Sequence, residues 1–168
     1  HAVSKHPGVV AGDFDLTTTA YALMLGYEIK DVATVKAAYS SVADDGILNI
    51  QNTATGGQSK LYTEAWWNYG AVGTAGANTI SLAVNGNVEG YDLTAQYTNV
   101  NTDRKGADTA AKLNELALVA SKTFGPLDAQ LVYIYTSAKA NDNGFSVDMG
   151  DNDKYTSNAL QAYLTLNF

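Results

Sequence analysis

The sequence predicts an all-β protein, a transmembrane antiparallel β-barrel with about seven wall strands in its 168 residues. Apolar side chains recur at every second position over segments of about ten residues, the length that a tilted strand needs to cross a bilayer. Short and long connections alternate between these segments. The polar face of most segments carries small or uncharged side chains, which suits a barrel interior that holds water.

Seven segments show the two-residue period of a strand. In the first of them, Tyr21, Leu23 and Leu25 fall on one face, and mostly small or polar residues lie between them. Val119 and Val132 blur the polar face of the fifth and sixth segments. The predicted strands are Thr17–Ile29, Ala33–Val42, Thr79–Val88, Tyr91–Val100, Leu113–Phe124, Ala129–Ala138 and Ala159–Phe168.

The connections between these strands are of two kinds. Tight turns are predicted at 30–32, 89–90 and 125–128, and long polar connections at 43–78, 101–112 and 139–157. This asymmetry is typical of a transmembrane barrel, which has short periplasmic turns and longer outer loops. Within the long outer loop 43–78, residues 60–68 carry aromatic side chains on both faces. We therefore expect 60–68 to be a short helix or constriction segment that folds toward the pore, and residues 1–15 to be loop-like.

Two alternative architectures are also compatible with this sequence. The same alternation would fit a soluble antiparallel sandwich or a lipocalin-like barrel, although the long strands and unequal loops favour the membrane. Single-chain bacterial barrels have even strand numbers, so seven strands predict the C-terminal part of a longer barrel. The alternative is a complete, small eight-stranded outer-membrane barrel that uses residues 60–68 as a wall strand and acts as a structural, adhesion or binding protein.

Composition and motifs exclude several classes of function. The chain has 17 acidic and 10 basic side chains and a net charge of -7, which argues against a nucleic-acid binder. It has no cysteine, so it forms neither disulfides nor thiolate metal sites. His1 and His6 have no orienting carboxylate at a spacing typical of a nucleophilic triad. We expect no enzyme activity.

Four stretches of the sequence resemble the major outer membrane porins of Campylobacter and related bacteria. They are Tyr21–Val42, Ser59–Gly70, Lys112–Tyr135 and Asn158–Phe168. The resemblance covers most of the chain but only the C-terminal part of a family member. It implies a homotrimeric porin of roughly 16–18 strands, with a water-filled, cation-preferring channel for small hydrophilic solutes in the bacterial outer membrane. It also implies Ca²⁺ at an acidic constriction, for which Glu64 is a candidate ligand.

The residues expected to act fall into two groups. The pore-lining or constriction candidates are Glu64, Asp44, Asp45, Lys36 and Glu115. A carboxylate at a constriction lowers the energy of a passing cation by about 1–4 kcal/mol at 4 Å. The alternative is that Glu64 is a solvated loop charge, and that Lys36 and Glu115 are solvated lumen side chains with little effect.

The second group comprises aromatic residues near the strand ends, which would contact outer-membrane lipid in two girdles. These are Tyr21, Tyr27, Tyr39, Tyr97, Tyr135, Phe124 and Phe168. The alternating last strand and Phe168 also match the general signal read by the barrel assembly machinery. Residues 141–153 are rich in Asp and Gly, and we expect an acidic surface loop there with an antigenic or colloidal role.

Overall fold

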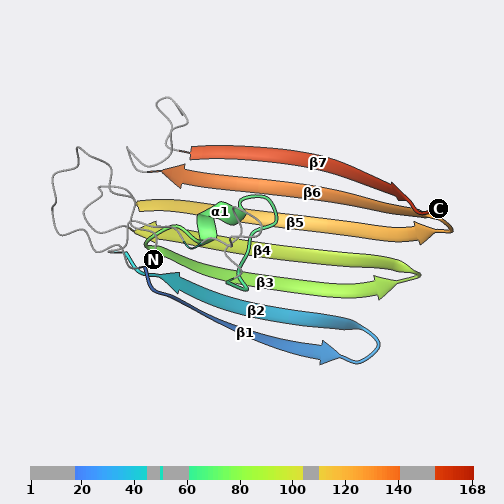
Figure 1. The fold of residues 1–168 in the computed structure, drawn as a ribbon, viewed down its shortest axis with the longest axis horizontal. Helices are drawn as coiled ribbons and strands as arrows, with labels where there is room; N and C mark the ends of the chain where they lie inside the picture. The colour runs from blue at the N-terminus through green and yellow to red at the C-terminus, as the bar shows by residue number, and fades with distance from the viewer. Residues whose placement is uncertain (1–17, 45–49, 51–60, 104–109, 141–153) are drawn as a thin grey trace.

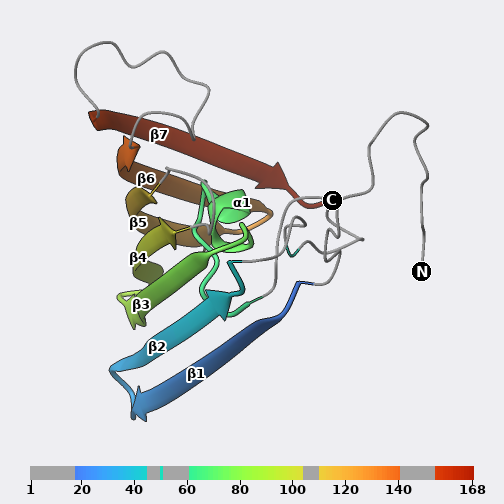
Figure 2. The same ribbon diagram turned by 90° about the vertical axis from the view of Figure 1, so that its left-hand side faces the viewer.

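The computed structural model describes residues 18–44, 50, 61–103, 110–140 and 154–168 as one curved antiparallel sheet with a short helix on its inner side (Figures 1 and 2). The strands follow one another in the order β1 to β7, each paired with its neighbour in sequence. Their bounds are β1 Ala20–Ile29, β2 Ala33–Val42, β3 Ala77–Val88, β4 Tyr91–Asp103, β5 Ala110–Phe124, β6 Leu127–Ala140 and β7 Lys154–Leu166. Within these residues β1 and β7 form the two open edges.

The seven antiparallel strands predicted from the sequence are confirmed, but several are longer than their hydrophobic pattern suggested. The connections predicted between β4 and β5 and between β6 and β7 were too long at both of their ends. The reason is that backbone pairing continues through polar residues, such as Asn101 opposite Lys112. Similarly, Lys139 pairs with Lys154. The first strand begins at Ala20 rather than Thr17, and Phe168 lies beyond the last strand. The predicted loop 141–153 lies outside the described residues.

The three tight turns all lie at one end of the sheet, opposite the long connections (Figure 1). Glu89 and Gly90 both have positive φ, 52° and 79°, as the type I′ turn that suits the twist of a hairpin requires. The third turn is shorter than predicted, because Phe124 already pairs with Leu127. Gly125, with φ of 62°, takes its first central position, where a glycine is needed.

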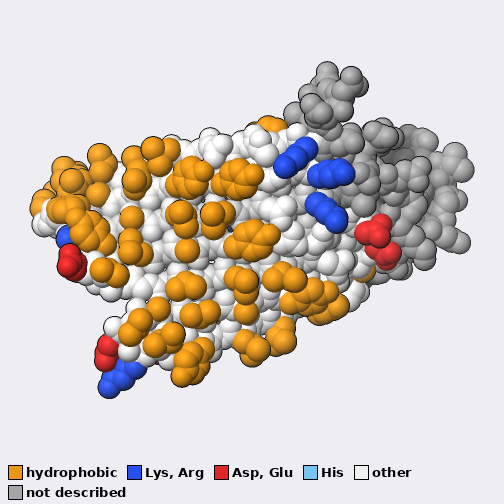
Figure 3. Space-filling model, turned by 180° about the vertical axis from the view of Figure 1, so that it is seen from behind, with side chains coloured by type: hydrophobic (Ala, Val, Ile, Leu, Met, Phe, Trp, Pro, Cys, Tyr) orange, Lys and Arg blue, Asp and Glu red, His pale blue; other side chains and the backbone are white. Residues whose placement is uncertain are grey.

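The two faces of the sheet differ in polarity and in exposure. The outer face carries a continuous band of exposed apolar side chains, visible in Figure 3. Leu23, Leu82 and Leu164 on this face are 62%, 49% and 71% exposed. The inner face buries polar groups instead, including Ser40, Thr98 and Glu115. This arrangement is the reverse of a water-soluble half-buried sheet, in which the apolar face is covered.

Residues 61–76 lie against the inner side of the sheet, as Figures 1 and 2 show, and we call them the inner segment. Residues 61–68 are not a strand, and the helix α1, Tyr69–Val72, follows them. The inner segment packs against the sheet, and the two together bury a small apolar cluster. Its buried members are Ala65, Val72, Ala77, Val100 and Leu113. At the end of the segment, Gly76 N–H donates to Ala43 O at 3.0 Å, and Gly76 O accepts from Asp103 N–H at 3.1 Å.

A second apolar cluster on the inner face accounts for the weak alternation of β5 and β6. Val119, Val132 and Ile134 are buried together, with Ala159 of β7 packed against them. No helix among the described residues combines the length and apolarity that a bilayer crossing by a helix demands.

Candidate functional site

Glu115 fastens the inner segment to the wall. Its side chain is only 2% exposed, and both of its carboxylate oxygens accept hydrogen bonds. Oε1 accepts from Trp67 N–H at 3.0 Å, while Oε2 accepts from Asn68 N–H at 2.9 Å and Asn68 Nδ2 at 2.7 Å. Asn68 Nδ2 also donates to Thr136 Oγ1 at 3.1 Å. Such charge-assisted bonds are about twice as strong as neutral ones.

The interpretation of Glu115 as a solvated lumen side chain is therefore wrong. Its place on the polar face was predicted correctly, but the inner segment covers it and uses its charge. In all three bonds the partner group is an N–H donor and Glu115 only accepts, as an ionised carboxylate must. We expect Glu115 to set the position of the inner segment rather than to meet a solute.

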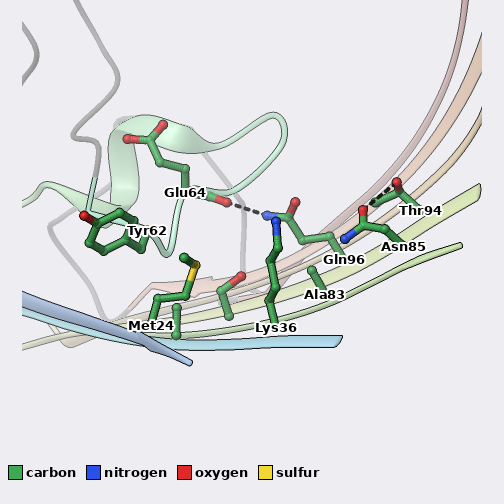
Figure 4. Close-up of a pocket in the computed structure, with 10 residues that line it drawn as sticks. Met24, Lys36, Tyr62, Glu64, Ala83, Asn85, Thr94 and Gln96 are labelled. Atoms are coloured by element: carbon green, nitrogen blue, oxygen red, sulfur yellow. Dashed lines mark hydrogen bonds between the residues drawn. The ribbon is translucent and has the colours of Figure 1, made fainter. Parts of the chain in front are cut away.

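A pocket of about 460 Å³ lies between the inner segment and the inner faces of β1 to β4 (Figure 4). Most of the residues that line it are polar or small; the polar ones include Lys36, Glu64, Ser81, Asn85, Thr94 and Gln96. Figure 4 shows the Lys36 side chain rising from the sheet beside Gln96. The pocket is therefore lined by one cationic side chain and several uncharged hydrogen-bonding groups, together with Glu64.

Glu64 is held in this pocket through its backbone. Gln96 Nε2 donates a hydrogen bond to Glu64 O, which ties β4 to the inner segment. The Glu64 carboxylate points away from Gln96, as Figure 4 shows. One residue earlier, Thr63 shares a buried hydrogen bond of 2.6 Å with Ser40 of β2. The inner segment is thus bonded to the sheet through the side chain of Thr63 and the backbone carbonyl of Glu64.

Asp44, one of the remaining constriction candidates, is not among the residues that line this pocket. Asp44 is exposed where the chain leaves β2, and Asp45 lies outside the described residues. The described residues contain no group of three or more His, Cys, Asp or Glu side chains that could hold a metal ion. Glu64 also shares its pocket with Lys36, whose charge repels a cation. Because Ca²⁺ takes six to eight oxygen ligands, Glu64 as a Ca²⁺ ligand stays a prediction.

Three tyrosines on the outer face form a repeated pattern that we call the Tyr–Asn belt. Each tyrosine hydroxyl donates to an asparagine on the next strand. This asparagine is two residues away from the residue directly opposite the tyrosine, toward the long-connection end. The pairs are Tyr39 with Asn78 at 3.1 Å, Tyr97 with Asn114 at 2.8 Å, and Tyr133 with Asn158 at 2.6 Å. They join β2 to β3, β4 to β5 and β6 to β7 in the same diagonal sense.

Of the predicted girdle residues, Tyr39 and Tyr97 belong to the belt and Tyr135 does not. Tyr39 and Tyr97 are exposed on the outer face as expected. Tyr135 is half-buried, and Tyr133, two residues earlier, carries the asparagine bond. Tyr21 packs beside Tyr39, with ring centroids 6.1 Å apart. The sequence contained a usable signal for this belt, namely an Asn on the strand after each Tyr, but the diagonal pairing required the register.

A second group of aromatic side chains lies at the tight-turn end of the outer face. Tyr27 and Phe124 are exposed there. The Lys122 ammonium lies 3.8 Å from the Tyr91 ring centroid and 5.7 Å from that of Phe124, and it donates to Glu89 O at 3.2 Å. Phe168 is fully exposed beyond β7. Aromatic side chains therefore border the apolar band at both ends, as in a membrane barrel.

Comparisons with protein-family models, curated proteins and solved structures gave no match for this chain.

Proposed function

We propose that this chain forms part of the wall of an outer-membrane porin whose water-filled channel conducts small hydrophilic solutes and prefers cations. The observation that carries the proposal is the pairing of an exposed apolar outer face, bordered by aromatic residues, with a polar inner face that holds an inward-folded segment. The proposal includes the homotrimer that the resemblance of the sequence implies. It involves no catalytic step.

The Tyr–Asn belt gives a strand tilt that suits a barrel. From Tyr39 to Tyr97 to Tyr133 the belt shifts by two residues for every two strands, relative to the pairing register. With a rise of about 3.3 Å per residue and a strand spacing of about 4.8 Å, this shift corresponds to an angle of about 35°. A belt that lies flat at a membrane surface therefore requires strands tilted by about 35°, within the range of transmembrane barrels.

The same tilt gives the thickness of the apolar band. On β5 the outer face runs from Asn114 to Phe124 over ten residues, or about 33 Å along the strand. A tilt of about 35° reduces this length to about 27 Å along the membrane normal, close to the band of about 25 Å in outer-membrane barrels. Because lipid offers no hydrogen bonds, the edges of β1 and β7 that are open among the described residues must be paired in the membrane.

Neither alternative architecture fits the described residues as well. A soluble sandwich needs a second layer over the apolar face, whereas Leu23 and Leu164 are exposed. The eight-stranded barrel needs a wall strand at residues 60–68, whereas 61–68 form none and lie on the inner side of the sheet. The inner segment and the pocket beneath it are where a passing solute would meet charged side chains.

Planar-bilayer recording of the full-length protein tests the proposal. We expect ohmic conductance and a reversal potential that indicates cation preference in a salt gradient; absence of conductance, or anion preference, overturns it. Glu64→Gln should lower the cation-to-anion permeability ratio and Lys36→Gln should raise it, each by about two- to fivefold, because a charge a few ångströms from an ion in a wet pore contributes about 1 kcal/mol. Shifts in the same direction would exclude the pocket from the conduction path.

A further inference from the structure

Three lysines stand side by side on the outer face, at its long-connection end. Lys112 of β5 pairs with Lys139 of β6, which in turn pairs with Lys154 of β7. All three are exposed, and Figure 3 shows basic side chains grouped at the border of the apolar band. We call these residues the lysine row. Across strands spaced about 4.8 Å apart, the row is about 10 Å long.

The lysine row is unfavourable on its own, because like charges directly opposite each other across strands repel. Within the described part of the chain, no ion pair joins the three ammonium groups to a carboxylate. The carboxylate of Asp103 is on the same face, but Asp103 pairs with Ala110 and is only diagonal to Lys112. The chain as a whole has a net charge of -7, so this concentration of positive charge runs against the overall charge. An anionic partner would remove the repulsion.

The height of the row above the Tyr–Asn belt indicates which anion it meets. We measure the height in steps of two residues along a strand. The row lies about two and a half steps above the belt on β5, three on β6 and three and a half on β7. With the tilt of about 35°, these steps correspond to about 13, 16 and 19 Å along the membrane normal. The headgroup layer of a phospholipid bilayer is only about 5–8 Å thick on each side. The two lysines farthest above the belt, Lys139 and Lys154, therefore stand above phospholipid phosphates, even allowing for about 6 Å of side-chain reach.

We propose that the lysine row binds the anionic headgroup of a glycolipid, whose phosphate or carboxylate groups are carried on sugars above the acyl chains. This proposal rests on the proposed membrane location of the barrel. The apolar band directly below the row, with Leu160 and Tyr133 exposed, would contact the acyl chains of the same lipid. Lysine suits such a site, because it presents a flexible point charge to phosphate.

Native mass spectrometry of the full-length protein in detergent micelles tests this proposal. The probes are deep-rough lipopolysaccharide, phosphatidylglycerol and inorganic phosphate. Lipopolysaccharide should bind more tightly than either other probe. Lys139→Gln, at the centre of the row, should weaken its binding about three- to tenfold, and the triple variant with K112Q and K154Q should weaken it further. Lys30→Gln, at the first tight turn, removes the same charge elsewhere and should change the affinity less than about twofold.

Three results would overturn the assignment: equal effects of K139Q and K30Q, equal affinity for phosphatidylglycerol, or equal affinity for inorganic phosphate. The glycolipid site and the proposed channel fail separately. Binding is measured in detergent without any conductance, and K139Q should retain the channel conductance of the parent protein. A conducting protein with an inert lysine row refutes only the site, whereas a non-conducting protein refutes the channel.

Discussion

Glu115→Gln should release the inner segment from the wall. The substitution keeps the shape of the side chain but replaces one acceptor oxygen by an NH₂ group. If the remaining oxygen accepts the two bonds of Asn68, the new NH₂ group faces the Trp67 N–H, donor against donor. Net contributions of hydrogen bonds to charged groups are about 1.5–3 kcal/mol each. Losing one bond and weakening the others should cost about 2–3 kcal/mol of docking free energy, which raises the detached population about 30- to 150-fold.

Single-channel recording of the full-length protein provides the assay. The Glu115→Gln channel should show larger open-channel noise and a higher mean conductance, because a detached segment no longer narrows the proposed channel. Limited proteolysis should cut the segment near Trp67 faster than in the parent. Glu28→Gln is the matched control, since Glu28 is exposed on the inner face of β1 and loses the same charge. Unchanged noise and proteolysis in Glu115→Gln, with the barrel folded, would refute the reasoning.

Two further predictions concern the wall itself. Gly86→Ala should lower the midpoint of denaturation in detergent, by about 1–3 kcal/mol of stability, because its Cβ would meet Val32 O at 2.9 Å; Gly26→Ala, whose Cβ has 3.8 Å to its nearest neighbour, should leave it almost unchanged. Equal midpoints would contradict the close approach. Tyr133→Phe should cost about 0.5–1.5 kcal/mol by the same measurement, because the asparagine partner of its hydroxyl loses a 2.6 Å bond; a neutral result would show that the belt does not stabilise the fold.

The strand positions and the polarity of their faces were predictable because both depend on local sequence. A period of two places Tyr21, Leu23 and Leu25 on one face whatever lies across the sheet. The ends of the strands were less predictable. Asn101, Lys112 and Lys139 read as loop residues, since they are polar, but backbone pairing does not depend on side-chain polarity and continues through them. Chain regions that look like loops can therefore extend a strand above an apolar band.

The role of Glu115 could not be found from the sequence. Its partners Trp67 and Asn68 are 48 and 47 residues away, and no local pattern links them. The sequence indicated only that Glu115 is on the polar face and that residues 60–68 make a poor wall strand. Which of the inner-face groups the inner segment covers depends on how the chain returns from β2 to β3.

The sequence by itself determined that this protein is an all-β chain with one oily and one polar face, because alternation is written residue by residue. The tertiary structure decided which side chains meet: the carboxylate of Glu115 under the inner segment, the tyrosines beside their asparagines, and the three lysines in one row. The physical reason is register. A slip of one residue between strands would leave each strand's own pattern intact and yet separate all of these groups.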